Sequence, residues 1–472
     1  MRYPEYPEYE DSDVPWIGRL PKGWSALRLK FLGDTILGLT YAPEEITDEQ
    51  NGTLVLRANN IQDRQLVAND PVYVSAEAPE KLKLQEGDIL ICSRNGSRHL
   101  IGKCGRVTSE FVGCYFGAFN TVFRSQENDY MFYVLNSSLF EFQSGSYLTS
   151  TINQLTIGAL NSFMIPLPSS NEQQRIAAFL DWKTGQIDAL IAKKKELLEK
   201  LKEKRLAVIT QAVTKDLPST GSGQATATMK DSGIPWLGQV PEHWEVKRAR
   251  FVMQVNPSAP RLRSLTSEDE VSFIPMDAVG VQGGLSLEQT RVLADTSGGY
   301  TEFQDGDVVV AKITPCFENG KAALANGLMN GAAFGTTELH VLRADATLDQ
   351  RFLFYVAISD TFHKLGESEM YGAGGQKRVP PEFINDFRLS LPPLTEQAAI
   401  AEYLIEVTGK IDLMMNKTEF AIDRLTEYRT ALILLCHKRS LELIQLQCGQ
   451  KPSSPTSATL KCKRNEVIES GT

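Results

Sequence analysis

The sequence predicts an α+β protein with an internal pseudo-twofold repeat, in which two globular domains are separated by two long antiparallel helices. Three observations support this prediction. A tryptophan-containing segment near the start of the chain recurs near its middle, each half closes with a long helical pattern, and the interiors carry short strand-like runs. The length of 472 residues, with 42% hydrophobic and 23% charged residues, is ordinary for a folded multidomain protein.

The repeated segment marks the start of each half. Nine of the 21 positions in residues 11–31 are identical in residues 231–251. Later matches join EGDILI at 86–91 to DGDVVV at 305–310, and LPSSNEQQRIAAFL at 167–180 to LPPLTEQAAIAEYL at 391–404. The middle of each half agrees poorly, which indicates one task performed on two different targets. The tryptophans of this frame are predicted to serve in packing and partner docking: Trp16, Trp24, Trp236 and Trp244.

The interiors of the halves are predicted to be compact α+β domains spanning 25–168 and 245–392. Short β-branched or apolar runs bounded by Gly, Asn, Asp and Pro are strand signals. Helical stretches are expected near Met131–Phe142 and Arg351–Leu365. The predicted strands are Thr53–Leu56, Asp88–Cys92, Thr121–Phe123, Val308–Ile313 and Leu339–Leu342.

The end of each half is predicted to be a long helix, over 169–215 and 393–440. Asn171 and Thr395 are candidate N-caps, and Pro168 must lie outside the first helix. Apolar residues recur with heptad-like spacing, which favours two helices packed as a coiled-coil pair. The alternative is two ordinary amphipathic helices on globular cores. The seam positions are Ile187, Leu190, Leu197, Leu201 and Val208, then Leu404, Ile411, Met414, Ala421, Leu425, Tyr428, Leu432 and Leu435.

The remaining segments complete the predicted domain order. Frame segments cover 1–24 and 231–244, and a Gly/Ser/Thr-rich linker covers 216–230. The Ser/Pro-rich tail at 441–472 is expected to be poorly ordered. No apolar run approaches the ~18 residues of a membrane span, and the acidic N-terminus does not resemble a signal peptide.

The charge is distributed unevenly along the chain. The formal net charge of −9, taken alone, argues against a nucleic-acid partner. However, residues 1–13 contain one basic and five acidic residues, whereas 86–106 contain four basic and two acidic. Residues 183–215 contain nine basic and four acidic, which is either a solvated helix face or a phosphate-contacting one. An acidic total therefore leaves room for a DNA-binding protein whose positive charge is local.

No catalytic or metal motif is recognisable. The seven cysteines form no CxxC pair, the five histidines are scattered, and no GxxxxGK[ST] phosphate loop occurs. The Asn/Asp-Pro-Pro-Tyr/Phe loop of adenine methyltransferases is also missing. We therefore expect a non-catalytic, cytoplasmic chain with reduced cysteines and no metal site.

The frame PWIG…LPKGW and PWLG…VPEHW, the phrase LPxxxEQxxIAxxL and the closing long helices together resemble the specificity subunit of type I restriction–modification systems, over about residues 10–435. The resemblance implies that each interior is a target-recognition domain reading one half of a bipartite double-stranded DNA target. It also implies that the helices dock two modification (methyltransferase) subunits, which restriction (translocase–nuclease) subunits join. S-adenosylmethionine, ATP and Mg²⁺ are then expected on those partners, with no cofactor on this chain. The second half departs from the family's usual ending after about residue 440.

The residues expected to contact DNA lie in polar loops that follow the predicted strands. Arg and Lys read guanine, Asn and Gln read adenine, and basic or small polar groups hold phosphates. For any single position, the alternative is an ordinary solvated loop residue. The strongest candidates are Arg94, Arg98, Lys321, Lys377 and Arg378. The full set is Arg57, Asn59, Arg94, Asn95, Ser97, Arg98, Asn120 and Gln154 in the first domain, and Lys312, Thr314, Asn319, Lys321, Thr336, Gln376, Lys377 and Arg378 in the second.

Two other functions remain open from the sequence. A scaffold with two protein-binding globular ends would share the repeat but show no preference for a DNA sequence. A self-contained nuclease or methyltransferase is disfavoured by the missing catalytic loops.

Overall fold

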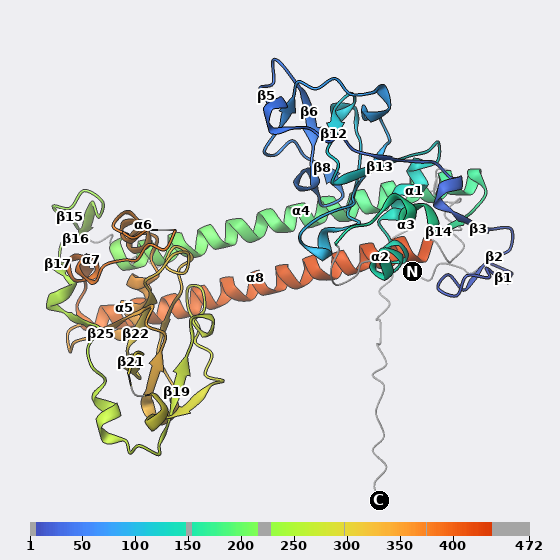
Figure 1. Ribbon diagram of the computed structural model, residues 1–472. Helices are drawn as coiled ribbons and strands as arrows, with labels where there is room; N and C mark the ends of the chain where they lie inside the picture. The colour runs from blue at the N-terminus through green and yellow to red at the C-terminus, as the bar shows by residue number, and fades with distance from the viewer. Residues whose placement is uncertain (1–5, 148–152, 216–227, 297, 374, 437–472) are drawn as a thin grey trace, which may run out of the picture. The chain divides into compact units, whose positions relative to one another are not determined.

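The computed structural model describes residues 6–147, 153–215, 228–296, 298–373 and 375–436 (Figure 1). The chain divides into two compact units. Unit 1 comprises 1–192 and 423–472, and unit 2 comprises 193–422. Both long helices therefore contribute residues to both units. The predicted linker, up to residue 227, and the predicted tail lie outside the described residues.

Unit 1 contains a short hairpin, two four-stranded sheets and three short helices. The hairpin pairs β1 (Tyr9–Asp11) with β2 (Arg19–Pro21), and β3 (Ser25–Arg28) pairs with β14 (Met164–Leu167). The first sheet has the order β11 (Cys104–Arg106), β10 (Ile89–Cys92), β13 (Asn120–Arg124), β4 (Asp34–Leu37). The second has the order β12 (Tyr115–Phe116), β6 (Thr53–Leu56), β9 (Tyr73–Val74), β5 (Ile46–Thr47). The other elements are the hairpin β7 (Ile61–Gln62) and β8 (Gln65–Leu66), and the helices α1 (Asn128–Leu135), α2 (Ser138–Tyr147) and α3 (Ile157–Ser162).

Unit 2 repeats this plan. The hairpin pairs β15 (Met229–Asp231) with β16 (Gln239–Pro241), and β17 (Glu245–Arg248) pairs with β26 (Arg388–Leu391). One sheet has the order β18 (Met253–Val255), β25 (Leu339–Ala344), β22 (Val308–Ala311), β23 (Ala322–Leu324). The other has the order β20 (Thr290–Val292), β19 (Glu270–Ile274), β24 (Ala332–Gly335), β21 (Thr301–Gln304). The short helices are α5 (Gln350–Ala357), α6 (Asp360–Ser368) and α7 (Pro381–Asp386).

The central strands show that the repeat extends into the interiors, where the sequences agree poorly. The four residues of β10 and the four of β22 are all buried, as expected for apolar runs in the middle of a covered sheet. In both units, an arginine on the strand next to an edge strand of this sheet is held in the same way. Arg124 donates through two nitrogens to Asp88, and Arg343 does the same to Asp307, at 2.6–2.9 Å. Each aspartate is almost fully buried, so the pair neutralises a charge inside the fold.

The predicted strands are present, and the predicted short helices are divided. Each of the five predicted strands overlaps an observed one, although β22 ends at Ala311 rather than Ile313. The helical stretch expected near 351–365 forms two helices, α5 and α6, because Ser359 caps a new one by accepting a hydrogen bond from Phe362 N. The stretch near 131–142 is likewise split into α1 and α2.

The long helices are α4 (Ser170–Lys215) and α8 (Leu394–Cys436), and both begin before the predicted caps at Asn171 and Thr395. Within each unit they lie side by side and antiparallel (Figure 1). In unit 1, the start of α4 shares a core with Leu432 and Ile433 near the end of α8. In unit 2, the end of α4 shares a core with Ile400 and Leu404 near the start of α8.

The predicted coiled-coil seam is only partly buried. Ile187, Leu201, Leu404, Ile411 and Leu432 are buried. The prediction was wrong for Leu190, Leu197, Met414 and Tyr428, which are exposed. The buried positions near the helix ends are those that also pack against a globular domain, so the domains, rather than a continuous seam, cover the apolar faces.

Candidate nucleic-acid interface

Three polar segments of unit 1 meet at the end of β10. The amides of Ser93 and Arg94 both donate to Phe119 O at 2.9 Å, and Leu155 N donates to Ser93 O at 2.7 Å. Arg94 also forms a backbone bridge with Gln154. Residues 93–99, 117–119 and 153–154, here called the first loop surface, are thereby fixed to one another by main-chain bonds that do not depend on side-chain identity.

The equivalent segments of unit 2 meet at the end of β22. Lys312 N donates to Glu338 O, and Thr314 N donates to Lys377 O, at 2.9 and 3.0 Å. The Thr314 hydroxyl accepts a 2.7 Å bond from Lys377 N. Residues 312–314, 336–338 and 375–378, here called the second loop surface, repeat the arrangement of the first with different side chains. Thr336 belongs to this surface, where its hydroxyl accepts from Glu338 N.

The first loop surface presents cations and an aromatic ring to solvent. Arg94 is exposed and lies over the ring of Phe119, with 5.3 Å between the guanidinium carbon and the ring centroid. The side chain of Asn95 accepts from Ser97 N, which shapes the loop, and Arg98 donates to Gly145 O. Sequence reasoning missed Phe119; an exposed aromatic beside a Gly-Ala turn was the available signal.

The second loop surface presents a smaller set of free polar groups. Gln376 and Lys377 are exposed, and Lys312 is half-buried. Asn319 is exposed in the turn that follows, after Pro315. Arg378, one of the strongest candidates, is held by a double ion pair with Glu338 at 2.8 and 2.9 Å. This guanidinium also lowers the pKa of Glu338, so the pair carries no net charge at neutral pH.

Two predicted DNA contacts are instead parts of the interior scaffold. Asn120 is fully buried at 0% exposure, and its amide donates to Leu56 O, so it cannot meet a ligand in this conformation. The ammonium of Lys321 is half-buried and donates to Met276 O at 2.8 Å. Lys103 makes the equivalent bond to Ile61 O in unit 1. Each lysine therefore holds a neighbouring segment of main chain in place. Its ammonium group points toward the interior rather than toward solvent.

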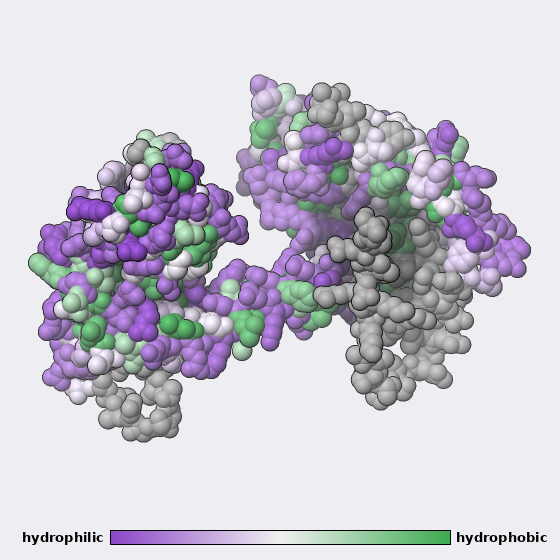
Figure 2. Space-filling view, turned by 90° about the horizontal axis from the view of Figure 1, so that it is seen from below, coloured by the Kyte–Doolittle hydropathy of each residue, from purple (hydrophilic) through white to green (hydrophobic). Residues whose placement is uncertain are grey.

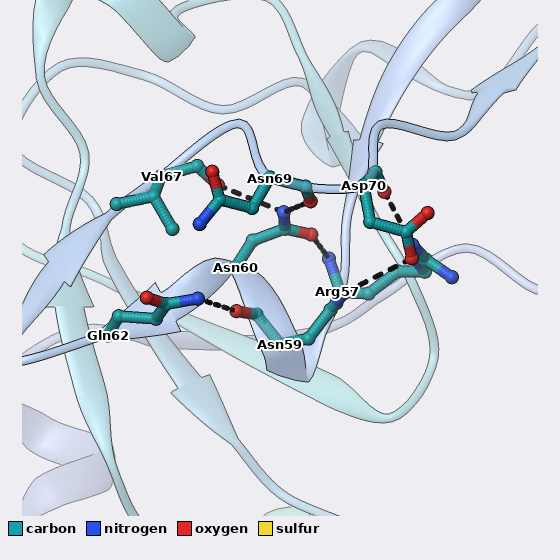
Figure 3. Close-up of polar contacts among 7 residues, drawn as sticks. All are labelled: Arg57, Asn59, Asn60, Gln62, Val67, Asn69 and Asp70. Carbon is teal, nitrogen blue, oxygen red and sulfur yellow. Dashed lines mark hydrogen bonds and ion pairs between the residues drawn. The ribbon is translucent and has the colours of Figure 1, made fainter. Parts of the chain in front are cut away.

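Arg57 and Asn59 belong to a braced turn beside β6 (Figure 3). The buried Asn60 is its centre: its amide donates to Val67 O and Asn69 O, and its side-chain oxygen accepts from Arg57 N. The Arg57 guanidinium pairs with Asp70 at 2.6 Å, which neutralises it. Asn59 remains exposed. Arg57 is therefore a structural residue in this conformation. Of these two residues, Asn59 is the one that faces solvent without a strong partner.

The frame tryptophans fall into two classes. Trp24 and Trp244 donate through their indole nitrogens to Glu172 and Glu396, at 3.1 and 2.9 Å. These bonds fasten the frame segment to the first turn of α4 or α8. The adjacent glutamines, Gln173 and Gln397, donate to Pro168 O and Pro392 O. The repeated LPxxxEQ phrase is therefore the buried junction between strand, frame and long helix.

The other frame aromatics face outward at matching positions of both units. Trp16 and Trp236 are 45% and 37% exposed, and Phe31 and Phe251 are 68% and 69% exposed. A shallow hollow of about 330 Å³ lies beside Trp16, and one of about 630 Å³ lies beside Trp236. On the face shown in Figure 2, hydrophilic residues dominate and hydrophobic ones form separate small patches. Paired exposed aromatics are therefore a distinct feature of the surface.

The described part of the chain shows neither a metal centre nor a membrane-spanning helix. Among those residues, no group of three His, Cys, Asp or Glu side chains is placed to hold a metal ion. No helix within them is both long enough and apolar enough to cross a membrane.

Two equivalent domains, each bearing a loop surface beside a shared pair of helices, define a two-part recognition protein. The family model for the type I restriction modification DNA specificity domain matches residues 21–203 and 241–420, and the chain belongs to this family. The two matched segments place one DNA specificity domain of this family in each half of the chain.

Specificity subunits from enterobacteria resemble the chain to different extents. The EcoAI specificity subunit of Escherichia coli is 37% identical over 187 residues, which are 39% of this chain and 31% of that subunit. The chain thus matches about a third of that relative's length. The StySPI subunit of Salmonella potsdam is 26% identical over 428 residues, covering 87% of this chain and 88% of the relative.

One solved structure shares the fold over most of its length. It is titled "Structural basis underlying complex assembly and conformational transition of the type I R-M system", and it matches with a TM-score of 0.63 at 16% identity. The match covers 89% of this chain and 98% of that one. This likeness establishes the two-domain fold with long helices.

Proposed function

We propose that this chain reads a bipartite duplex DNA target, with each recognition domain reading one half-site through its loop surface. The observation that supports the proposal is the repetition of one loop framework with two different sets of side chains. Main-chain bonds from Ser93 and Arg94 to Phe119 fix the first framework, and those between Thr314 and Lys377 fix the second. A fixed framework with variable side chains is what two different target sequences require.

The exposed side chains suit base and phosphate contacts. Arg94 and Arg98 in the first surface can read guanine or hold phosphates, and Asn95 can pair with adenine. Gln376, Lys377 and Asn319 offer the same chemistry in the second. The Arg94 guanidinium lies over the ring of Phe119, a contact that restricts the orientation of this exposed cation.

The repeated outward-facing aromatics support docking of two copies of one partner. Trp16 and Phe31 in unit 1 match Trp236 and Phe251 in unit 2, so one complementary surface would fit both units. We assign this partner as the modification (methyltransferase) subunit. Restriction subunits then join the modification subunits. S-adenosylmethionine, ATP and Mg²⁺ belong to the partners, and the complex acts on DNA in the cytoplasm.

Mapping adenine methylation across the genome, before and after deletion of the gene, tests this function. The expected result is the complete loss of one bipartite methylated motif, with all other motifs unchanged. An unchanged methylome in a strain whose modification subunits are active would refute the proposal. If the purified complex bound duplex DNA without any sequence preference, the scaffold function would replace it.

A further inference from the structure

A cavity of about 760 Å³ lies in unit 1 beneath the hairpin β7–β8. Its wall includes more basic than acidic side chains. Arg98 and His99 enter it from the first loop surface, and Arg64 enters from the hairpin tip. The remaining charged residues of the wall are Lys103, Asp63 and Glu141.

Within the described residues, the side chain of Arg64 has no hydrogen-bond or ion-pair partner. It sits at the hairpin tip with a φ of +66°, a left-handed conformation that costs energy for a residue with a side chain. No hydrogen bond or ion pair joins it to another residue within the ranges that the structure describes, although it is half-buried. Burial lowers the pKa of Arg64, and the nearby charge of Arg429 lowers it further. The strained backbone of Arg64 and its unpaired, partly buried guanidinium both raise the free energy of the protein when no ligand is bound.

The neighbouring Arg429 is also incompletely satisfied. It is 4% exposed on α8, and its Nε and Nη2 lie 2.8 and 3.1 Å from the carboxylate of Asp188 on α4. Its Nη1 is buried and has no hydrogen-bond partner. The charges of Asp188, Glu141 and Asp63 all favour the charged form of Arg64, but none of these carboxylates forms an ion pair with it in the described part of the chain.

Unit 2 shows the same construction with its charges balanced. Arg205 of α4 pairs with Asp412 of α8 at 2.8 Å, and a hairpin-like turn at 280–284 reaches the pair. There the side-chain and main-chain oxygens of Gln282 accept from Arg205 at 2.9 and 3.1 Å. In unit 2 the recognition domain thus reaches the interhelical ion pair through a neutral amide, whereas in unit 1 the charge of Arg429 in the equivalent pair acts on a second cation, Arg64.

We propose that the unit 1 cavity binds a phosphate group of the DNA backbone, with Arg64 as its principal ligand and Arg98 at its mouth. This rests on the proposed function, because the cavity shares Arg98 and His99 with the first loop surface. An oxyanion in the cavity would supply the negative charge that Arg64 lacks, and a guanidinium can hold two phosphate oxygens at once. The contact would orient the duplex against unit 1 without reading its sequence.

The test compares Arg64→Gln, which gives unit 1 the amide present in unit 2, with Lys81→Gln. Lys81 is exposed in unit 1, outside the cavity wall, and its substitution removes the same charge. The assembled methyltransferase complex is titrated with its target duplex and with a scrambled duplex at several salt concentrations. For R64Q, we expect affinity for both duplexes to fall by a similar factor, with the slope of log K against log salt smaller by about 1. K81Q should match the wild type.

Two further measurements keep the result interpretable. Arg64→Lys retains the charge and should retain the wild-type slope of log K against log salt. An equal reduction of this slope in R64K and R64Q would overturn the proposal. Inorganic phosphate should raise the melting temperature of the wild-type chain and leave that of R64Q unchanged. A phosphate effect equal in both variants, or one without any change in the DNA slope, would also overturn it.

Failure of this inference and failure of the proposed function give different results. If the wild-type complex does not distinguish the target from the scrambled duplex, the proposed function fails. If it does distinguish them, and R64Q keeps the wild-type slope, only the phosphate site is refuted.

Discussion

Arg94 is the residue whose surroundings best match base reading. It is exposed, it follows a fully buried strand, and it lies over the exposed ring of Phe119. Its main chain is held by Phe119 O and by the bridge to Gln154, so its side chain is aimed by the fold rather than by a salt bridge. Arg378, by contrast, already forms an ion pair with Glu338.

Arg94→Ala should weaken or relax recognition of one half-site only. Loss of a specific guanidinium–base contact costs about 1–3 kcal/mol of discrimination, or roughly a 5- to 150-fold loss against the correct base. Methylation by the assembled complex of duplexes altered in either half would measure this effect. Lys377→Ala should act on the opposite half. If Arg94→Ala relaxed both halves, the two domains would not read independently.

His363 of α6 makes a second residue-level prediction. Its ring nitrogens are buried and the ring lies against Phe317 and Phe362. Burial lowers the pKa of His363 to about 4, although the main chain of Phe317 and the charge of Asp360 oppose the shift. The folded state therefore keeps this imidazole neutral at pH values where the unfolded chain binds a proton.

The free energy of unfolding should therefore be level above about pH 6.5 and fall as the pH drops from there toward 4, by on the order of 3 kcal/mol from this one group. His363→Leu should remove this contribution and flatten the profile over that range. Urea unfolding at a series of pH values would measure it. Parallel profiles for the two proteins would show that His363 titrates normally.

At the scale of elements, an arginine–aspartate pair joins the two long helices in each unit. Arg205 pairs with Asp412, and Arg429 pairs with Asp188. In both pairs the arginine is buried and the aspartate is partly exposed. The pairs occupy equivalent positions of the repeat, because Asp188 and Asp412 close the matching motifs. They fix the register of the helices where each globular domain rests.

Asp412→Ala should destabilise unit 2 by about 1–3 kcal/mol, because it leaves the guanidinium of Arg205 buried with only the oxygens of Gln282. Glu406→Ala is the matched control. Glu406 pairs with Lys410 on the same helix, both groups are exposed, and its loss should cost less than about 0.5 kcal/mol. Denaturant midpoints would compare them, and equal losses would contradict a special role for the interhelical pair.

At the scale of the whole molecule, the C-terminal helix completes the core of the N-terminal domain. Leu432 and Ile433 are both buried in the cluster that contains Ile89 and Phe123 of unit 1. Unit 1 is thus formed from the two ends of the described chain, whereas unit 2 is formed from its middle.

Leu432→Ala should therefore loosen unit 1 and leave unit 2 unchanged. A buried Leu→Ala change costs about 2–5 kcal/mol. Hydrogen exchange should become faster in β10 of unit 1, with β22 of unit 2 still protected. Leu413→Ala, at an exposed position of the same helix, should alter neither. Faster exchange confined to β22 would show that the helix end belongs energetically to the other unit.

Much of the architecture could be predicted because its signals are local or repeated. The frame tryptophans, the LPxxxEQ phrase and the two long helices recur in order, so their existence did not depend on knowing any contact. The central strands were predictable because β10 and β22 are unbroken apolar runs. The exact helix starts and the extent of the buried seam could not be predicted. The burial of each helix face depends on where the globular domains cover it.

The site was predicted less well, and the reason lies in burial. A polar residue in a loop gives the same sequence pattern whether its side chain faces water or the interior. Asn120 and Lys321 looked like Arg94, yet their side-chain donors bond to main-chain oxygens of residues remote in the sequence, Leu56 and Met276. Arg64 drew no attention because its significance lies in Arg429, 365 positions away.

The sequence by itself determined the repeat, the family and the order of elements, because motif spacing and hydrophobic period are properties of short stretches. Only the tertiary structure decided which cations are free. Arg57, Arg378 and Lys321 are neutralised or turned inward by Asp70, Glu338 and Met276 O, whereas Arg64 is left unpaired. The electrostatic free energy of a charge depends on partners and solvent within a few ångströms, and those neighbours are set by the folding of segments remote in the chain.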